Sequence, residues 1–372
     1  MNKNLVSTLI LGAVIVACGG GANEAPSPEA PPATPPAAAD TASTASTVAP
    51  PAAPPTLTDK LLATLKALDD AVDAGDAVKV ASFYTATGVL KQPGDADHVG
   101  RDAIQGSMKE LFTSFPNLKL ASRRIMVKDA VAIVEWTLTG TNSGPGLGGS
   151  PSTGKAIGLN GASVFAFDGD GFIQEEHEYA DAPTLLSQLG MSKQPARDVV
   201  ALPTGAPEVH VAKGTPEEAK NADAVKAVDR AFETKDEKTF AAANADDITW
   251  DDMTTAAPVN GKQASVANFR AGTKAFSDMK VDCQMWAFED WVAQDCTTTA
   301  KNTGPLPTGA KATHPATNKS VTFHNLDVMQ MKDGKATHGW SYGNGMEIAA
   351  QLGPAARVSE KQAATAKKAP QK

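Results

Sequence analysis

The chain has 372 residues, of which 42% are hydrophobic and 20% are charged, and its formal net charge at pH 7 is −8. This composition is typical of a globular protein, and the length allows about two to three domains. Because the basic residues form no block in the body of the chain, the negative balance excludes broad affinity for nucleic acid.

The first residues predict an export signal. Lys3 supplies a short positive stretch, and the apolar run Leu5–Ala17 is too short to span a bilayer as a stable helix. The run ends in small apolar residues followed by Cys18, which resembles the lipobox of bacterial lipoproteins. That resemblance implies that residues 1–17 are removed and that Cys18 becomes the lipidated N-terminus. An ordinary secretory signal with an incidental cysteine is the alternative.

The residue after Cys18 indicates the membrane to which the lipoprotein would be sorted. It is Gly19, whereas an aspartate there is the usual inner-membrane retention signal of Gram-negative lipoproteins. The resemblance therefore implies an exported chain in the bacterial cell envelope, with the outer membrane or periplasm favoured. The lipid membrane would be a partner through the Cys18 anchor.

Residues 18–56 predict a disordered tether. They consist mostly of Ala, Pro, Ser and Thr, with almost no large apolar residue that could offset the entropy of ordering. Proline-rich chains extend about 3 Å per residue, so this segment could hold the folded part on the order of 100 Å from a membrane.

The first folded unit, residues 57–190, begins with helical patterns and continues with strand patterns. Apolar residues from Leu61 to Val72 recur at helical spacing, with Thr58 or Asp59 as N-cap, and further helices are expected at Val78–Tyr84 and after Gly100. The strands and the closing helix are expected at Leu118–Val127, Val131–Thr139, Ala156–Phe167, Phe172–Tyr179 and Ala182–Leu189. This order predicts an α+β fold.

A second unit, residues 222–353, repeats the first. The Asp-Gly turn recurs, and the end Gln188-Leu189-Gly190 returns as Gln351-Leu352-Gly353. Because each unit is long enough to have its own core, the repeat predicts two domains of one fold rather than a solenoid. Residues 191–221 are expected to be a linker and residues 354–372 a disordered tail.

Cys283 and Cys296 predict a disulfide. They lie on successive predicted strands around the turn Glu289-Asp290. Counting outward from a two-residue loop places them opposite each other at a non-hydrogen-bonded pair, where Cα atoms lie about 4.5 Å apart, within the range that a disulfide tolerates. Export makes oxidation feasible. Two separate buried thiols are the alternative if the turn is longer.

Several short motifs together resemble the SnoaL-like polyketide cyclase and ester cyclase family, part of the nuclear transport factor 2-like superfamily. They are Thr153-Gly154-Lys155, the Asp-Gly turn, Tyr179-Ala180-Asp181 and Gln188-Leu189-Gly190. The resemblance implies two tandem cone domains, each with three helices packed on a curved antiparallel sheet around a pocket. It also implies that the sheets of the two domains pair as an internal pseudo-dimer.

The sequence departs from the family pattern at informative places. The family's His-Trp pair appears as Glu176-His177 in the first unit and as Gly339-Trp340 in the second. The family's terminal aspartate is kept as Asp181 and replaced by Asn344.

The strand that ends near Asp181 carries the candidate chemistry. Its period of two places Glu175, His177, Tyr179 and Asp181 on one face. In the family the matching aspartate is a general acid/base, so the resemblance makes Asp181 the first catalytic candidate and His177 the second. The alternatives are an exposed or internally paired face, and a helix N-cap role for Asp181 that Asn344 would also satisfy.

Two functions follow as expectations. The first is an envelope lipoprotein that binds a small hydrophobic ligand or acts as a scaffold. The second is a cyclase or isomerase that uses Asp181, with the second domain degenerate. The six histidines show no paired spacing, so no metal or cofactor is expected. The candidate ligand-binding residues are Tyr84, Trp136, Glu175, Tyr179 and Trp340.

Overall fold

A computed structural model describes residues 54–145, 149–193, 197–307, 312–353 and 356–357. Residues 1–17, the anchor Cys18, most of the tether and most of the tail lie outside these ranges. Within the described ranges, no helix is long and apolar enough to cross a membrane.

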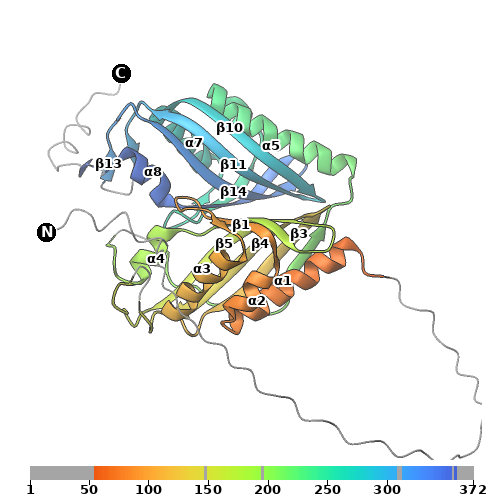
Figure 1. The fold of residues 1–372 in the computed structure, drawn as a ribbon. Coiled ribbons are helices and arrows are strands. Elements are labelled where there is room, and N and C mark those ends of the chain that lie inside the picture. Colours follow the sequence, from red (N-terminus) through yellow and green to blue (C-terminus); the bar gives the residue numbers. More distant parts are fainter. Residues whose placement is uncertain (1–53, 146–148, 194–196, 308–311, 354–355, 358–372) are drawn as a thin grey trace, which may run out of the picture.

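Domain 1 is a sheet with its helices on one side (Figure 1). The strand order is β2-β1-β6-β5-β4-β3-β7, and β7 (Glu208–Val211) comes from the segment that leads to the second domain. The other elements are α1 (Leu57–Asp73), α2 (Ala77–Ser82), β1 (Tyr84–Lys91), β2 (His98–Val99), α3 (Arg101–Ser114), β3 (Lys119–Lys128), β4 (Val131–Thr141), β5 (Ala156–Phe167), β6 (Ile173–Tyr179) and α4 (Ala182–Gln188).

Domain 2 repeats this plan with the strand order β10-β11-β14-β15-β8-β9. A small sheet of β12 (Leu306–Pro307), β13 (Ala312–His314) and β16 (Ala356–Arg357) lies beside it. The remaining elements are α5 (Pro216–Thr234), α6 (Glu237–Ala242), β8 (Asn244–Asp252), β9 (Val259–Asn260), α7 (Lys262–Ala275), β10 (Phe276–Phe288), β11 (Trp291–Asn302), β14 (Ser320–Lys332), β15 (Lys335–Gly343) and α8 (Gly345–Leu352). The predicted α+β class with two tandem cone domains is confirmed.

Three local features differ from the sequence expectations. Strand β1 was not expected, although its Tyr, Thr and Val residues favour strands, and it pairs in parallel with β6, so the sheet is not wholly antiparallel. Helix α1 is capped by Thr56 in a capping box with Asp59. Helix α5 begins at Pro216, inside the segment 191–221 that was expected to be a linker, because the Thr215 capping box starts a first turn that lacks apolar periodicity.

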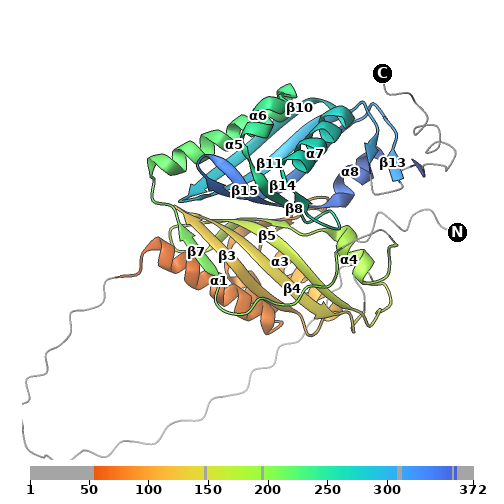
Figure 2. The ribbon, with the colours of Figure 1, turned by 180° about the vertical axis from the view of Figure 1, so that it is seen from behind.

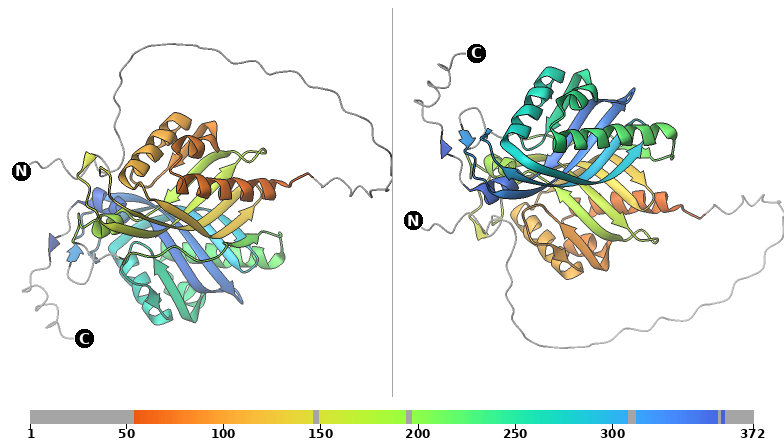
Figure 3. Two further views of the ribbon diagram at one scale, coloured as in Figure 1. Left: turned by 90° about the horizontal axis from the view of Figure 1, so that it is seen from below. Right: turned by 90° about the horizontal axis from the view of Figure 1, so that it is seen from above.

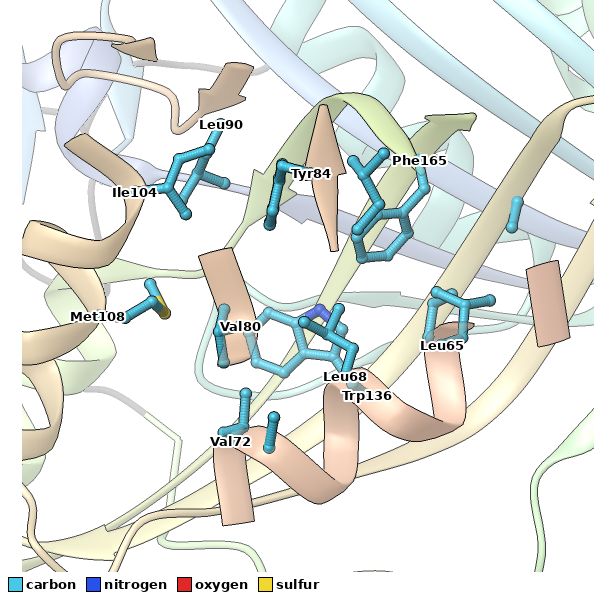
Figure 4. Close-up of a cluster of buried hydrophobic side chains, with 14 of the residues drawn as sticks. Leu65, Leu68, Val72, Val80, Tyr84, Leu90, Ile104, Met108, Trp136 and Phe165 are labelled. Carbon is cyan, nitrogen blue, oxygen red and sulfur yellow. The ribbon is translucent and has the colours of Figure 1, made fainter. Parts of the chain in front are cut away.

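The helices of domain 1 pack on its sheet through one continuous apolar core. Leu61, Leu65 and Leu68 of α1 belong to this core together with Trp136 of β4. Figure 4 shows Leu68 beside the Trp136 ring. A Cβ atom at Gly161 would lie 2.1 Å from the Trp136 ring. Only glycine therefore lets the indole lie flat on the sheet at this place.

The two sheets face each other, and the helices of each domain lie on the far side (Figures 1 and 2). Figure 3 shows the molecule from below and from above, so that the two sheets overlap in the view. One apolar cluster draws on both domains; its buried members are Met126, Ile133, Ala162, Val164, Tyr179, Met253, Phe288, Trp291, Ala293, Leu326, Val328 and Tyr342. The inner faces of both sheets therefore share a core.

The predicted disulfide between Cys283 and Cys296 is present. The two residues are register partners on β10 and β11, with their Cα atoms 4.1 Å apart. The bond joins neighbouring strands of domain 2 on the face that meets α5, where Cys296 is 2% exposed.

We expect reduction of this disulfide to lower the free energy of unfolding by about 2–3 kcal/mol, because the bond closes a short loop and restricts the unfolded chain. Urea unfolding with and without dithiothreitol measures the loss. The double variant Cys283→Ala/Cys296→Ala is the control, since dithiothreitol should not change its midpoint. Equal wild-type midpoints under both conditions would contradict the expectation.

Candidate functional site

Strand β6 presents two different sets of side chains on its two faces. Val164 and Ala162, the register partners of His177 and Tyr179, belong to the core between the domains, so this face is turned toward domain 2. The alternate residues Glu176 and Glu178 point into the cone of domain 1, where they meet β1. The candidate face of the strand therefore lies at the domain boundary and not inside the cone.

His177 is held between two carboxylates at that boundary. Its Nδ1 lies 2.6 Å from Asp295 Oδ2 of domain 2, and its Nε2 lies 2.7 Å from Glu175 Oε1. Burial opposes the charged imidazole, but the bonds to Asp295 and Glu175 outweigh it and raise the pKa of His177. Lys91 also pairs with Glu175 at 2.9 Å. His177 thus forms part of an ion network between the two sheets.

Two tyrosine–carboxylate contacts cross the boundary in opposite directions. Tyr179 of domain 1 donates its hydroxyl to Asp295 Oδ1 at 2.5 Å, and Tyr342 of domain 2 donates to Glu135. Tyr179 and Tyr342 hold corresponding places in the two repeats, each two residues before Asp181 or Asn344. The arrangement is reciprocal, as in an interface related by a two-fold axis.

The Glu135 contact includes a stacked arginine. Arg124 pairs with Glu135, and its guanidinium lies 3.9 Å from the ring of Trp291 and 4.9 Å from the ring of Trp340. Arginine over an aromatic face gains a cation–π attraction that is stronger when water is excluded. Trp340, a candidate ligand-binding residue, is placed here by the structure, away from the cone of domain 1.

Asp181 caps two helices at once. Its Oδ2 accepts from the backbone amide of Thr184 at 2.9 Å, and its Oδ1 accepts from the amide of Gly345, the first residue of α8, at 3.0 Å. The side chain is 4% exposed. Burial raises the pKa of Asp181, and these hydrogen bonds oppose the rise. The carboxylate therefore joins the N-terminus of α4 to that of α8.

Asn344 shows why the second repeat differs. Its Oδ1 accepts from the Met346 amide at 3.0 Å, and its Nδ2 donates to the carbonyl of Pro93 in domain 1 at 2.8 Å. An ionised aspartate has no hydrogen to donate to that carbonyl. The two positions thus make different contacts, and each requires the residue that it has.

The cone of domain 1 holds a second set of polar groups. Tyr84 donates its hydroxyl to Glu176, Gln92 donates to Glu178 Oε1 at 2.9 Å, and the Trp136 indole donates to Ser163 Oγ at 3.1 Å. The structure therefore places the candidate residues Tyr84 and Trp136 in the same compartment.

Glu176 is the strongest titratable candidate in this compartment. Burial, reinforced by the charge of Glu178, raises the pKa of Glu176 to about 8. Its side chain is 5% exposed. Alternation along β6 places Glu176 on the face opposite His177, so the sequence did not indicate it as a candidate.

Comparison with known proteins identifies the folded units. A family model described as SnoaL-like polyketide cyclase matches residues 63–189 and 222–352. No curated protein matches the chain. Similar solved structures include a SnoaL-like polyketide cyclase from Jannaschia sp. CCS1, with 19% identity, a TM-score of 0.33, and coverage of 36% of this chain and 93% of that chain.

Two further structures are similar to a comparable share of the chain. The LEH-like epoxide hydrolase of M. tuberculosis has 22% identity and a TM-score of 0.30, covering 37% of this chain and 88% of its own. TsrD from Streptomyces laurentii has 20% identity and a TM-score of 0.33, covering 36% and 96%.

The His177 contacts predict a pH-dependent contribution to stability. Because the folded-state pKa is raised, the contribution is fully present below the unfolded pKa of about 6.5 and is lost as pH rises through the folded value. The melting-temperature gap between wild type and His177→Gln should therefore be largest near about pH 6 and shrink toward about pH 9. Thermal unfolding across this range measures it.

His338→Gln is the matched control. Burial lowers the pKa of His338, so this variant should gain stability relative to wild type as pH falls below about 6.5. A wild-type to His177→Gln gap that stays constant with pH would show that His177 carries no charge between its two carboxylates.

Proposed function

Because the chain belongs to the SnoaL-like polyketide cyclase family through both of its domains, we propose that it is an exported, lipid-anchored binding protein in which the family's acid–base position has become a structural contact. One observation carries this proposal. Both oxygens of Asp181 accept backbone N–H bonds, one from each domain. A general acid/base must exchange its proton with a substrate, and these bonds occupy the atoms that would do so.

We infer that domains 1 and 2 stay paired in solution as an internal pseudo-dimer. The reciprocal contacts Tyr179–Asp295 and Tyr342–Glu135 support this inference, as does the apolar cluster that both sheets share. Such self-complementary contacts are typical of two-fold dimers, and here one chain supplies both halves.

The ligand that fits this proposal is small and hydrophobic, bound in the cone of domain 1. Apolar side chains, Tyr84 and Trp136 among them, pack inside this cone, and Glu176 offers one polar group there. Ligand sites of this kind are mostly apolar with a few placed polar groups. Lipidation at Cys18 and the tether 18–56 would hold the domains at the surface of an envelope membrane.

The variant Asp181→Asn tests the structural role. Its amide has one acceptor oxygen, so it caps α4 or α8 but not both, and we expect the free energy of unfolding to fall by about 1 kcal/mol. Binding of hydrophobic ketones and aldehydes, measured by calorimetry, should persist without turnover by mass spectrometry. Asp170→Asn, at an exposed turn position, is the control and should change neither quantity.

Two results would contradict this proposal. Turnover of a carbonyl compound by wild type that Asp181→Asn abolishes would make Asp181 catalytic. Absence of binding to every compound in the panel would remove the ligand part of the proposal and leave the scaffold role.

The cyclase or isomerase alternative is favoured by a different residue. Glu176 lies inside the cone beside the Tyr84 hydroxyl, with its pKa raised by burial to about 8. A carboxyl group with such a pKa is suited to acid–base work near neutral pH. In this alternative, Glu176 exchanges the proton and Asp181 holds the domains together.

For that alternative we expect Glu176→Gln to abolish turnover of a hydrophobic carbonyl substrate and Asp181→Asn to retain it. If Glu176 abstracts a proton, the rate should increase as pH rises through about 8, because the carboxylate form is the base. Steady-state rates across pH measure this. Unchanged turnover in Glu176→Gln would exclude Glu176 as the base.

A further inference from the structure

The cores of the two domains are built differently. The buried apolar residues of domain 1 that face its helices form one cluster, whereas those of domain 2 form three separate clusters. Along β11, Val292 belongs to one cluster and Ala300 to another, and Gln294, Cys296 and Thr298 lie between them on the same face. A polar belt therefore interrupts the interior of domain 2.

A glutamine bridges two carboxylates in this belt. Gln294 Nε2 donates to Asp229 Oδ1 of α5 at 3.1 Å and to Asp327 Oδ2 of β14 at 3.4 Å. Ser341 Oγ of β15 donates to Asp327 Oδ1 at 2.6 Å. Asp229 and Asp327 are half-buried.

The carbonyl oxygen of Gln294 is an acceptor without a donor. The side chain is 4% exposed, and among the described residues Oε1 has no hydrogen-bond partner, although Nε2 of the same amide reaches both carboxylates. Buried polar atoms are nearly always paired, so an unpaired one within a polar cluster points to an occupant that donates a hydrogen bond.

Most of the charges around the cluster are carboxylates, with Arg197 beside Asp252 at its edge. The neighbouring charges that act on Asp229 are Asp327 and Glu233, and Asp252 acts on Asp327. In the part of the chain that the structure describes, neither Asp229 nor Asp327 forms an ion pair. Burial raises the pKa of each to about 6, so both are largely ionised at neutral pH. A cation would balance these two charges.

We propose that the cone of domain 2 binds a small protonated amine, whose N–H groups donate to Gln294 Oε1 and to the carboxylates of Asp229 and Asp327. Phe232 follows Asp229 by three residues on α5 and therefore lies beside it, and it packs with Phe240 and Phe269. In this proposal the carbon body of the amine lies against Phe232. This site is separate from the domain 1 cone and does not rest on its function.

Domain 1 provides an internal comparison. Its register pair Val134 and Ser163 lies where domain 2 has Gln294 and Asp327, and Trp136 lies where domain 2 has Cys296. Asp69, at the place of Asp229, is bonded to Ser122 of β3. At these corresponding positions, domain 1 therefore has neither the carboxylate pair nor the amide.

The test titrates the purified protein with 2-phenylethylamine, using 2-phenylethanol as the neutral analogue, by calorimetry at about pH 7.5. We expect the amine to bind at least about tenfold more tightly than the alcohol. Asp327→Asn and Gln294→Leu should each weaken amine binding by about tenfold, and Asp69→Asn should leave it unchanged.

The pH dependence of the wild type provides a readout that needs no variant. Amine affinity should fall as pH drops through about 6, because protonation removes the charges of Asp229 and Asp327. Equal binding of amine and alcohol, or no amine binding up to about 10 mM, would overturn the proposal and leave a water molecule as the occupant. Amine binding that survives Asp327→Asn and Gln294→Leu would also overturn it.

Discussion

The paired arrangement depends on one buried charge, the carboxylate of Glu135. It is 1% exposed and is bonded to Arg124 of its own sheet and to Tyr342 of the other domain. A buried carboxylate is tolerated only when its partners replace the water that it has lost. Since one of these partners belongs to domain 2, domain 1 cannot expose this face without leaving a charge underbonded. The stacking of Arg124 on Trp291 and Trp340 depends on the same contact.

Pairing of the two sheets determines which side chains of β6 lie at the domain boundary and which lie in the cone. A face used for pairing cannot also line a pocket, so His177 and Tyr179 join the sheets while Glu176 and Glu178 turn into the cone. The neighbouring residues of one strand thus serve two compartments with different solvation. The charged contacts at the boundary and the raised pKa of Glu176 in the cone are two results of one strand geometry.

The sequence predicted best what depends on local periodicity and register. Strand β5 was expected with both of its observed ends, and the pairing of Cys283 with Cys296 followed from counting outward from a turn. Alternation along β6 separated its residues into two sets but could not show which set faces the helices. That choice depends on packing against domain 2, more than a hundred positions away in the chain. The Asp229–Gln294–Asp327 cluster was not foreseen for the same reason, because its members come from three elements that only the fold brings together.

Fusion of two copies into one chain allows a contact that identical subunits cannot make. In a symmetric homodimer, the residue at the position of Asp181 would face its own copy, so an aspartate would bring two carboxylates toward the same axis. Here Asp181 accepts from α8 while Asn344 donates to the Pro93 carbonyl, so donor and acceptor are divided between the halves. The asymmetry also favours pairing of domain 1 with domain 2. Two copies of domain 1, or two copies of domain 2, would lack one of these two hydrogen bonds. The chain therefore encodes its own partner choice at a single pair of positions.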